Sequence, residues 1–297
     1  MVDHYPGDAI PQGSVCDGKV SCDTVSPLVS ICMPAYNNAD HIEKAIQSVL
    51  EQTYRNIEIV VVDDASSDNT YDLVKSIRDP RIRASKNDVN LGLAGNWNHT
   101  MDLANGAFVK LMGADDLLEP QAIKKELRAL LDNPSAVLAE SDSRVIDAIG
   151  RQHGTYRRYW RNGLVPGKRI ARASIRTFDR FGNPVANLIR SSALREVGGF
   201  DPSFVYITDY DFFVSIGLKG DVFIIHEPLN CFRVRSGANT SLVMGGGREA
   251  AYLAEHRKML DKHRQGLGLT GFDIAASVLV RRVWSFIVSI YLKLFAR

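Results

Sequence analysis

The fold is decided by residues 29–70, VSICMPAYNNADHIEKAIQSVLEQTYRNIEIVVVDDASSDNT. The first apolar run of this stretch ends at Pro34, and apolar residues then recur at helical spacing over residues 42–50. A second run, rich in β-branched residues, spans residues 57–62. Strands that alternate with helices predict an α/β fold, with a mostly parallel, Rossmann-like sheet flanked by helices.

The same alternation continues along the chain to about residue 135. Further elements are predicted as strands at 81–84 and 107–112 and as helices at 97–104 and 120–131. Asp40, followed three residues later by Glu43, has the spacing of a residue that caps the first helix. We therefore expect residues 27–135 to form the first half of one domain.

Polar clusters follow three of the predicted strands. They are Pro34-Ala35-Tyr36-Asn37, Asp63-Asp64-Ala65-Ser66 and Gly113-Ala114-Asp115-Asp116. The carboxyl ends of parallel strands lie at one edge of a sheet, where ligands bind in open α/β folds. Asp64 stands further beyond its strand than Asp63, so we assign a ligand contact to Asp64 and stabilisation of the helix start to Asp63.

The adjacent carboxylates Asp115 and Asp116 repel each other unless a cation offsets them. Mg²⁺ and Mn²⁺ prefer one or two carboxylates together with phosphate oxygens. The pair therefore indicates a site for a metal ion and a diphosphate, and the alternative is that one of the acids caps the following helix. No GxGxxG or GxxxxGK[ST] segment follows any strand, which argues against the common dinucleotide and P-loop sites.

Three segments together resemble glycosyltransferase family 2. They are residues 29–70, residues 90–120 (NLGLAGNWNHTMDLANGAFVKLMGADDLLEP) and residues 197–213, which contain VGGFDPSF and TDYDFF. The resemblance extends from about residue 26 to about residue 241. It implies a GT-A fold and transfer, with inversion, from a nucleoside diphosphate sugar with Mn²⁺ or Mg²⁺ as cofactor.

The resemblance also implies roles for individual residues. Asp116 would bind the metal, and the nucleotide-binding residues would be Pro34, Ala35, Tyr36, Asn37, Glu43, Asp64, Asn90, Asp115, Arg233 and Arg235. Many relatives carry a third acid at the position of Ala114, so metal binding would rest mainly on Asp116. Arg233 and Arg235 are candidates for stabilising the leaving diphosphate, although Arg235 is equally well explained as a solvated arginine. Glu43 is equally well explained by its capping position.

An inverting transferase needs a base that takes the proton of the acceptor hydroxyl. The family pattern places this base in the segment Ile207-Thr208-Asp209-Tyr210-Asp211. If Thr208 caps a helix, Asp211 completes a capping box and Asp209 points elsewhere, free for chemistry. We assign the base to Asp209, kept ionised by the helix N-terminus, and a supporting role to Asp211. The alternative is that both acids only stabilise the start of the helix.

Two segments indicate contacts with an anionic partner or a membrane. Residues 151–180 hold nine Lys or Arg and one acid, which suggests an anionic acceptor or an anionic membrane surface. Residues 272–297 are apolar, but their longest uncharged run has ten residues, Val283 to Leu292, which is too short to span a bilayer. This segment is either a helix packed on its own domain or in a homodimer, or an interfacial helix.

The sequence therefore predicts four parts: a flexible leader at 1–26, a nucleotide-sugar half at 27–135, an acceptor half at 136–241, and a helical extension at 242–297. No QxxRW segment occurs, which by analogy with the family implies non-processive transfer. The predicted reaction moves a sugar from a UDP- or dTDP-sugar to a sugar or lipid-linked glycan, in the assembly of surface polysaccharide or glycolipid of the cell envelope. The alternatives are an inactive sugar-nucleotide-binding relative and a nucleotidyltransferase, for which no Gly/Arg-rich phosphate loop is present. The four cysteines show no CxxC or Cys/His spacing, and together with the lack of an apolar leader this favours the cytoplasm, at the inner face of the membrane. No nucleic-acid partner is expected.

Overall fold

The computed structural model describes residues 26–234 and 249–295, with side chains to Val283 in the last helix. The predicted leader, apart from Ser26, and Arg235 lie outside the described residues. The strands are β1 (Val29–Ala35), β2 (Ile57–Asp63), β3 (Ile82–Lys86), β4 (Phe108–Leu111), β5 (Leu117–Leu118), β6 (Ala136–Ile146), β7 (Gln152–Tyr156), β8 (Gly163–Pro166), β9 (Asn187–Arg190) and β10 (Asp221–Arg233).

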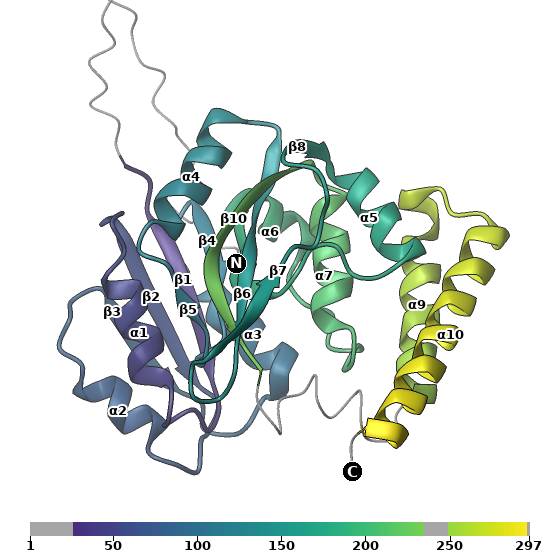
Figure 1. Ribbon diagram of the computed structural model, residues 1–297. Coiled ribbons are helices and arrows are strands. Elements are labelled where there is room, and N and C mark those ends of the chain that lie inside the picture. Colours follow the sequence, from purple (N-terminus) through teal and green to yellow (C-terminus); the bar gives the residue numbers. More distant parts are fainter. Residues whose placement is uncertain (1–25, 235–248, 296–297) are drawn as a thin grey trace, which may run out of the picture.

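Helices cover the sheet and extend beyond one of its sides (Figure 1). They are α1 (Ile42–Leu50), α2 (Thr70–Ser76), α3 (Gly92–Asp102), α4 (Ala122–Asp132), α5 (Gly167–Arg176), α6 (Ser191–Val197), α7 (Thr208–Gly217), α9 (Glu249–Leu267) and α10 (Gly271–Phe295), with a short 3₁₀ turn at Pro184–Ala186. The α/β fold with a C-terminal helical extension is thus confirmed.

One sheet joins strands from both predicted halves in the order β3-β2-β1-β4-β9-β6-β10-β5, with β7 paired to β6 and β8 to β10. The parallel arrangement expected from the sequence holds for β3-β2-β1-β4 and for β6 with β10. The short strands β5, β7, β8 and β9 pair antiparallel, so the second half of the sheet is mixed. Among these antiparallel pairs, only β6 and β7 are joined by a short return, which permits antiparallel pairing alone. Strands β5, β8 and β9 pair antiparallel with strands that lie far away in the sequence.

The core lies on both faces of the sheet. Every residue of β1 is buried, with Ile31 and Met33 packed toward α1 and α4 and Cys32 packed toward the face that carries α3 and α7. Such continuous burial is typical of a parallel strand covered on both sides. On the α4 face, the Nζ of Lys110 lies 2.7 and 2.9 Å from the carboxylate oxygens of Glu126, with both side chains fully buried.

The C-terminal helices α9 and α10 pack against α5 at the side of the domain away from α1 and α2 (Figure 1). Arg176 of α5 forms an ion pair of 2.8 Å with Asp273 of α10. Within the described ranges, no helix is both long enough and apolar enough to cross a bilayer.

Two predicted helix caps are wrong. Helix α1 begins at Ile42 after His41, without a side-chain cap, and the carbonyl of Asn38 accepts the N–H groups of His41 and Ile42. Asp40 therefore does not cap it, because the backbone of the preceding turn already satisfies these donors. Helix α7 begins at Thr208, whose hydroxyl donates to the carbonyl of Phe204.

Candidate active site

The loops after β1 and β2 meet at the carboxyl edge of the sheet, as predicted. The N–H of Asn37 donates to Ser66 Oγ (2.9 Å), and the N–H of Ser67 donates to Asn37 Oδ1 (3.0 Å). Asn37 and Ala65 have φ values of 51° and 57°, a left-handed conformation that is uncommon outside glycine and often found at functional sites. This interlocked pair of loops follows directly on Pro34 and Ala35.

Among the predicted nucleotide-binding residues of the first loop, Tyr36 is 50% exposed, so a ligand could reach its side chain. Glu43 is exposed in the first turn of α1, where an acid is favourable next to the helix N-terminus. The assignment of nucleotide contacts to these residues stays a prediction.

Asp64 is buried at the N-terminal end of α3. Its carboxylate accepts the side-chain amide of Asn87 (2.8 Å) and the backbone N–H groups of Leu91 (2.8 Å) and Gly92 (3.1 Å). The side chain of Asn90 in turn donates to the carbonyl of Asp64 (3.0 Å). Asp64 and Asn90 therefore fix the start of α3 beside the first loop, and their contact with a nucleotide stays a prediction.

Asp63, to which we assigned a purely local role, accepts the N–H of Ser66 through Oδ1 (2.9 Å). Lys86 of β3 lies 3.7 Å from the same oxygen. Both contacts hold the loop after β2 in place, and α2 begins only at Thr70, so the assigned stabilisation of the helix start stays a prediction.

Asp115 and Asp116 follow β4 and point toward one place above Gly113. A Cβ atom added to Gly113 would lie 2.9 Å from Oδ1 of Asp115 and 3.1 Å from Oδ2 of Asp116. Burial and the neighbouring Asp115 raise the pKa of Asp116 well above its ordinary value. The two acids do not cap a helix, because β5 follows them directly and α4 begins only at Ala122.

These residues fit a divalent cation, because a cation above Gly113 would offset the repulsion that raises the pKa of Asp116. The described part of the chain contains no group of three or more His, Cys, Asp or Glu that could hold a metal by itself. A metal here would complete its coordination with diphosphate oxygens and water, as Mg²⁺ commonly does.

Arg233, at the end of β10, is buried beneath the two acids. Its backbone N–H donates to Oδ1 of Asp116 (2.9 Å), and its Nε donates to the carbonyl of Asp115 (2.7 Å). Its Nη1 donates to the carbonyls of Asp147 (2.8 Å) and Ala148 (3.2 Å). Arg233 therefore holds the acidic loop against β10, and its contact with a diphosphate stays a prediction.

Asp209 lies in the first turn of α7, where its Oδ1 accepts the N–H of Tyr210 (2.8 Å). Burial and the nearby Asp179 raise the pKa of Asp209 to about 6, and Arg158 opposes this shift. Burial has a larger effect on this pKa than the backbone N–H groups at the start of the helix. A carboxylate with a pKa near neutrality is nonetheless well suited to general-base catalysis.

Sequence reasoning missed the charged residues around Asp209. Glu140 of β6 has a pKa raised well above its ordinary value by burial and by Asp179. Oε2 of Glu140 and Nε of Arg158 are buried and have no hydrogen-bond partner among the described residues. The signal for Glu140 was an acidic residue in a strand that is otherwise apolar at its start. Asp179 and Arg158 entered the sequence analysis only as part of the basic segment 151–180.

Asp211 faces away from Asp209 and toward α9. Its Oδ1 lies 2.8 Å from Nε2 of His263, and its Oδ2 accepts a bond of 2.7 Å from Nζ of Lys262. Asp211 therefore connects α7 to the helical extension instead of forming the predicted capping box, because its carboxylate is committed to α9.

Comparison with known proteins agrees with this geometry. A profile of Glycosyl transferase family 2 matches residues 30–198, more than half of the chain. An uncharacterized protein of Mycobacterium tuberculosis is 30% identical over 87% of this chain and 78% of its own length. The Escherichia coli UDP-Glc:alpha-D-GlcNAc-diphosphoundecaprenol beta-1,3-glucosyltransferase WfgD is 30% identical over 70% of this chain and 77% of its own.

Solved structures share the fold at low sequence identity. TarS of S. aureus, in complex with UDP-GlcNAc, superposes with a TM-score of 0.60 at 18% identity and covers 80% of this chain and 72% of its own. The mannosyltransferase PcManGT of Pyrobaculum calidifontis, in complex with GDP-Man and Mn²⁺, gives a TM-score of 0.62 at 19% identity and covers 90% and 74%. The sheet with its acidic edge, the matching profile and these relatives place the chain in glycosyltransferase family 2, as a glycosyltransferase with a GT-A fold.

Proposed function

We propose that the protein is an inverting, divalent-metal-dependent and non-processive glycosyltransferase that moves a sugar from UDP or dTDP to a hydroxyl of a lipid-linked glycan. The observation that carries the reaction type is Asp209, a partly buried carboxylate with a pKa of about 6 at the start of α7. At neutral pH most of this carboxyl is ionised, yet its proton affinity is high enough to accept a proton during attack.

In the proposed reaction, Asp209 takes the proton of the acceptor hydroxyl as the hydroxyl oxygen attacks the anomeric carbon. The bond between that carbon and the diphosphate oxygen breaks on the opposite face, and the nucleoside diphosphate leaves. A divalent ion held by Asp116 and Asp115 would stabilise the negative charge of the leaving diphosphate. Tyr36 and Asp64 would hold the pyrimidine base of the nucleotide. Arg233 keeps the acidic loop in position.

The choice of substrates is supported by relatives. The name of the E. coli relative WfgD specifies a UDP-glucose donor and a GlcNAc-diphosphoundecaprenol acceptor. The structural neighbours were solved with UDP-GlcNAc and with GDP-Man and Mn²⁺. We therefore favour a uracil or thymine base and a sugar diphosphate lipid as acceptor, with Mn²⁺ or Mg²⁺ as cofactor.

Membrane contact at the cytoplasmic face is part of the proposal. Phe272, Leu279 and Val283 are 81%, 61% and 50% exposed, and their spacing places them on one face of α10. An apolar stripe next to a basic segment is typical of an interfacial helix. The competing arrangement is a homodimer that covers the same stripe.

Replacing Phe272, Leu279 and Val283 by serine should abolish sedimentation with vesicles that contain phosphatidylglycerol. The folded core should stay intact, because the three side chains are exposed. A matched control replaces three exposed apolar residues elsewhere by serine: Val89, Leu131 and Val205. Unchanged sedimentation of the first variant refutes the membrane contact. A shift from dimer to monomer in that variant, without any vesicle binding by the unmodified protein, assigns the stripe to a homodimer.

The donor is tested by a thermal-shift screen of UDP, dTDP and GDP with and without Mn²⁺. A ligand that binds only the folded state raises the midpoint by mass action. We expect UDP or dTDP to raise it more with Mn²⁺ than without, and Asp116→Asn to remove the metal-dependent part. If none of the three nucleotides raises the midpoint even with Mn²⁺, the proposed function is wrong.

A further inference from the structure

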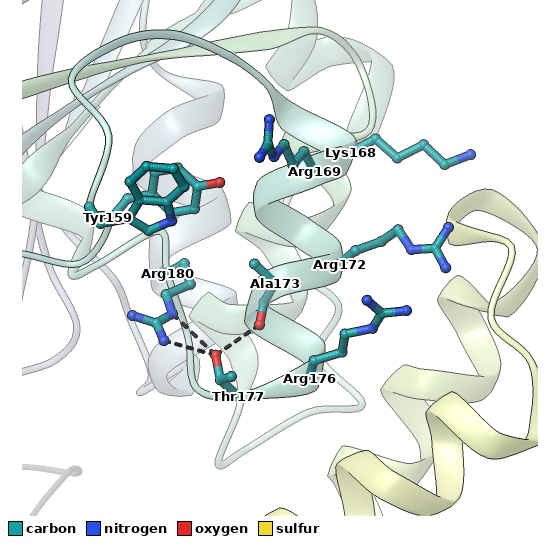
Figure 2. Close-up of a pocket in the computed structure, with 9 residues that line it drawn as sticks. Tyr159, Lys168, Arg169, Arg172, Ala173, Arg176, Thr177 and Arg180 are labelled. Atoms are coloured by element: carbon teal, nitrogen blue, oxygen red, sulfur yellow. Dashed lines mark hydrogen bonds between the residues drawn. The ribbon is translucent and has the colours of Figure 1, made fainter.

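A basic groove lies between α5 and the loop that precedes β8, outside the acidic edge of the sheet. Its volume is about 620 Å³, and it is lined by Tyr159, Trp160, Lys168, Arg169, Arg172, Ala173, Arg176, Thr177 and Arg180. Figure 2 shows Lys168, Arg172 and Arg176 projecting from one side of α5, while Arg169 lies on the side of Tyr159 and Arg180. The lining thus combines five cations and two aromatic rings without any acid.

The cations of the groove differ in their partners. Arg176 is paired with Asp273, and Arg180 is fixed by hydrogen bonds to Oγ1 of Thr177 (3.0 and 3.2 Å). The side chains of Lys168, Arg169 and Arg172 make no hydrogen bond or ion pair within residues 26–234 and 249–283. Two arginines of the groove are therefore held in place, while Lys168, Arg169 and Arg172 keep N–H groups that can bind an anion.

The inner end of the groove adjoins the residues that surround the base. Nη1 of Arg180 donates to the carbonyl of Arg158 (3.1 Å), and Arg158 lowers the pKa of Asp209. Asp179, the residue before Arg180, raises that same pKa. The loops that carry Arg158 and Asp179, the charged neighbours of Asp209, therefore also form one wall of the groove.

The outer end of the groove adjoins the apolar stripe of α10. The contact is the ion pair between Arg176 and Asp273, and Phe272, next to Asp273, is 81% exposed. The groove therefore adjoins both the charged neighbours of Asp209 and the start of the apolar stripe. A sugar linked through a diphosphate to a lipid likewise combines a reacting hydroxyl, two phosphates and an apolar chain.

We propose that this groove binds the diphosphate of a lipid-linked sugar acceptor, with Arg169 and Arg172 contacting its phosphates and Trp160 covering the adjoining sugar or isoprenoid unit. The indole of Trp160 is 71% exposed and stacks on Tyr159 with 5.9 Å between ring centroids, so one of its faces is open to a ligand. This inference rests on the proposed function for the identity of the acceptor, but the binding of the diphosphate itself can be measured independently.

The test uses the full-length protein, geranyl diphosphate as the probe and titration calorimetry as the readout. The variant is Arg169→Gln/Arg172→Gln. The matched control is Arg195→Gln/Arg264→Gln, which removes the same charge from two exposed arginines outside the groove. Loss of two charge-assisted contacts predicts about tenfold weaker binding of the probe or more for the variant, and unchanged binding for the control.

Two further probes separate the sources of the signal. Geraniol, which lacks the phosphates, should bind the unmodified protein much more weakly than geranyl diphosphate. Vesicles of phosphatidylcholine with phosphatidylglycerol present phosphate headgroups without a diphosphate. If the variant loses vesicle binding but keeps its affinity for geranyl diphosphate, the groove serves the membrane surface and the proposal is overturned.

Binding of UDP with Mn²⁺ to the same variant separates failure of the groove from failure of the proposed function. We expect it to be unchanged, because the groove and the acidic pair are built from different elements. Equal weakening of geranyl diphosphate binding in the variant and the control overturns the groove, and so does absence of binding to the unmodified protein. Failure of UDP binding in every protein overturns the proposed function, while the result with geranyl diphosphate still decides the groove.

Discussion

Replacing Asp209 by asparagine should make the protein more stable and inactive. Burial and Asp179 raise the pKa of Asp209 from 3.8 to about 6, so the folded state disfavours the ionised carboxyl. A shift of that size corresponds to about 3 kcal/mol. The side chain is partly exposed, and solvent screening reduces the expected stabilisation to roughly 1–2 kcal/mol. Asparagine can still accept the N–H of Tyr210 through its own oxygen.

The pH dependence gives the sign of this effect. A carboxyl whose pKa is higher in the folded state favours folding at low pH, and this contribution is lost as the pH rises from 3.8 through about 6. Asparagine does not titrate, so the gain in the free energy of unfolding for Asp209→Asn should be small near pH 4 and reach its full size above pH 6. Urea unfolding at a series of pH values measures this difference.

Asp201 provides a control of opposite sign. Its pKa is lowered to about 2, with hydrogen bonds from Ser203 and Lys262 that outweigh its desolvation. A lowered pKa stabilises the folded state above 3.8, and this contribution is lost as the pH falls toward 2. Asp201→Asn should therefore destabilise the protein at neutral pH.

Activity completes the test of Asp209. Asp209→Asn should keep UDP binding and lose transfer by about 10²- to 10⁴-fold, the usual contribution of a general base. The reasoning is refuted if Asp209→Asn destabilises the protein at pH 8, or if its effect on stability is the same at every pH. The assignment of the base is reversed if Asp209→Asn remains active while Asp211→Asn is inactive.

Four further predictions concern the same site and its supports. The value of kcat/KM should fall about tenfold per pH unit below pH 6, and Asp179→Asn should move the midpoint to lower pH; an unmoved midpoint contradicts the role of Asp179. Gly113→Ala should remove the Mn²⁺-dependent part of UDP stabilisation, measured by calorimetry, because its Cβ would contact both acids, and unchanged metal dependence argues against the site. Lys110→Met should lower the free energy of unfolding in urea by about 3–5 kcal/mol, because Glu126 stays buried without its counter-ion. Adding Glu126→Leu should recover most of the loss, and equal instability of the single and double variants would contradict this explanation. Asp211→Asn should lower the free energy of unfolding by about 1–3 kcal/mol while transfer is retained, and an unchanged unfolding midpoint would show that α9 is held by other contacts.

The first half of the fold could be predicted because its signals are local. The β-branched run from Ile57 and the helical spacing from Ile42 are dictated by burial of one strand and one helix face, and both elements form within a few residues of the prediction. The second half could not be predicted in the same way. Strand β9 enters between β4 and β6, and this pairing depends on contacts between residues far apart in the chain.

The candidate site shows the same division. The acidic pair after β4 could be located because a strand end has a sequence signature, but the approach of both carboxylates above Gly113 depends on the conformation of the loop. The sequence predicted a supporting role for Asp211 but not its partners. Lys262 and His263 lie about fifty residues away on α9. A capping box is a local pattern, and a partner from a distant helix overrides it without leaving a trace in the local sequence.

The acids of the site have one physical property in common, which links catalysis to stability. Asp116, Glu140 and Asp209 all have raised pKa values because of burial, so each carboxylate would make the free enzyme less stable when ionised. The opposing cations are few, with Arg233 beside Asp116 and Arg158 near the other two. A metal ion with a nucleoside diphosphate would offset the repulsion at the acidic pair, so the loaded enzyme should gain most stability where these carboxyls are ionised, at neutral pH and above. The stability that the site lacks is supplied by contacts outside it, such as the apolar core on both faces of the sheet and the bonds that tie α7 to α9.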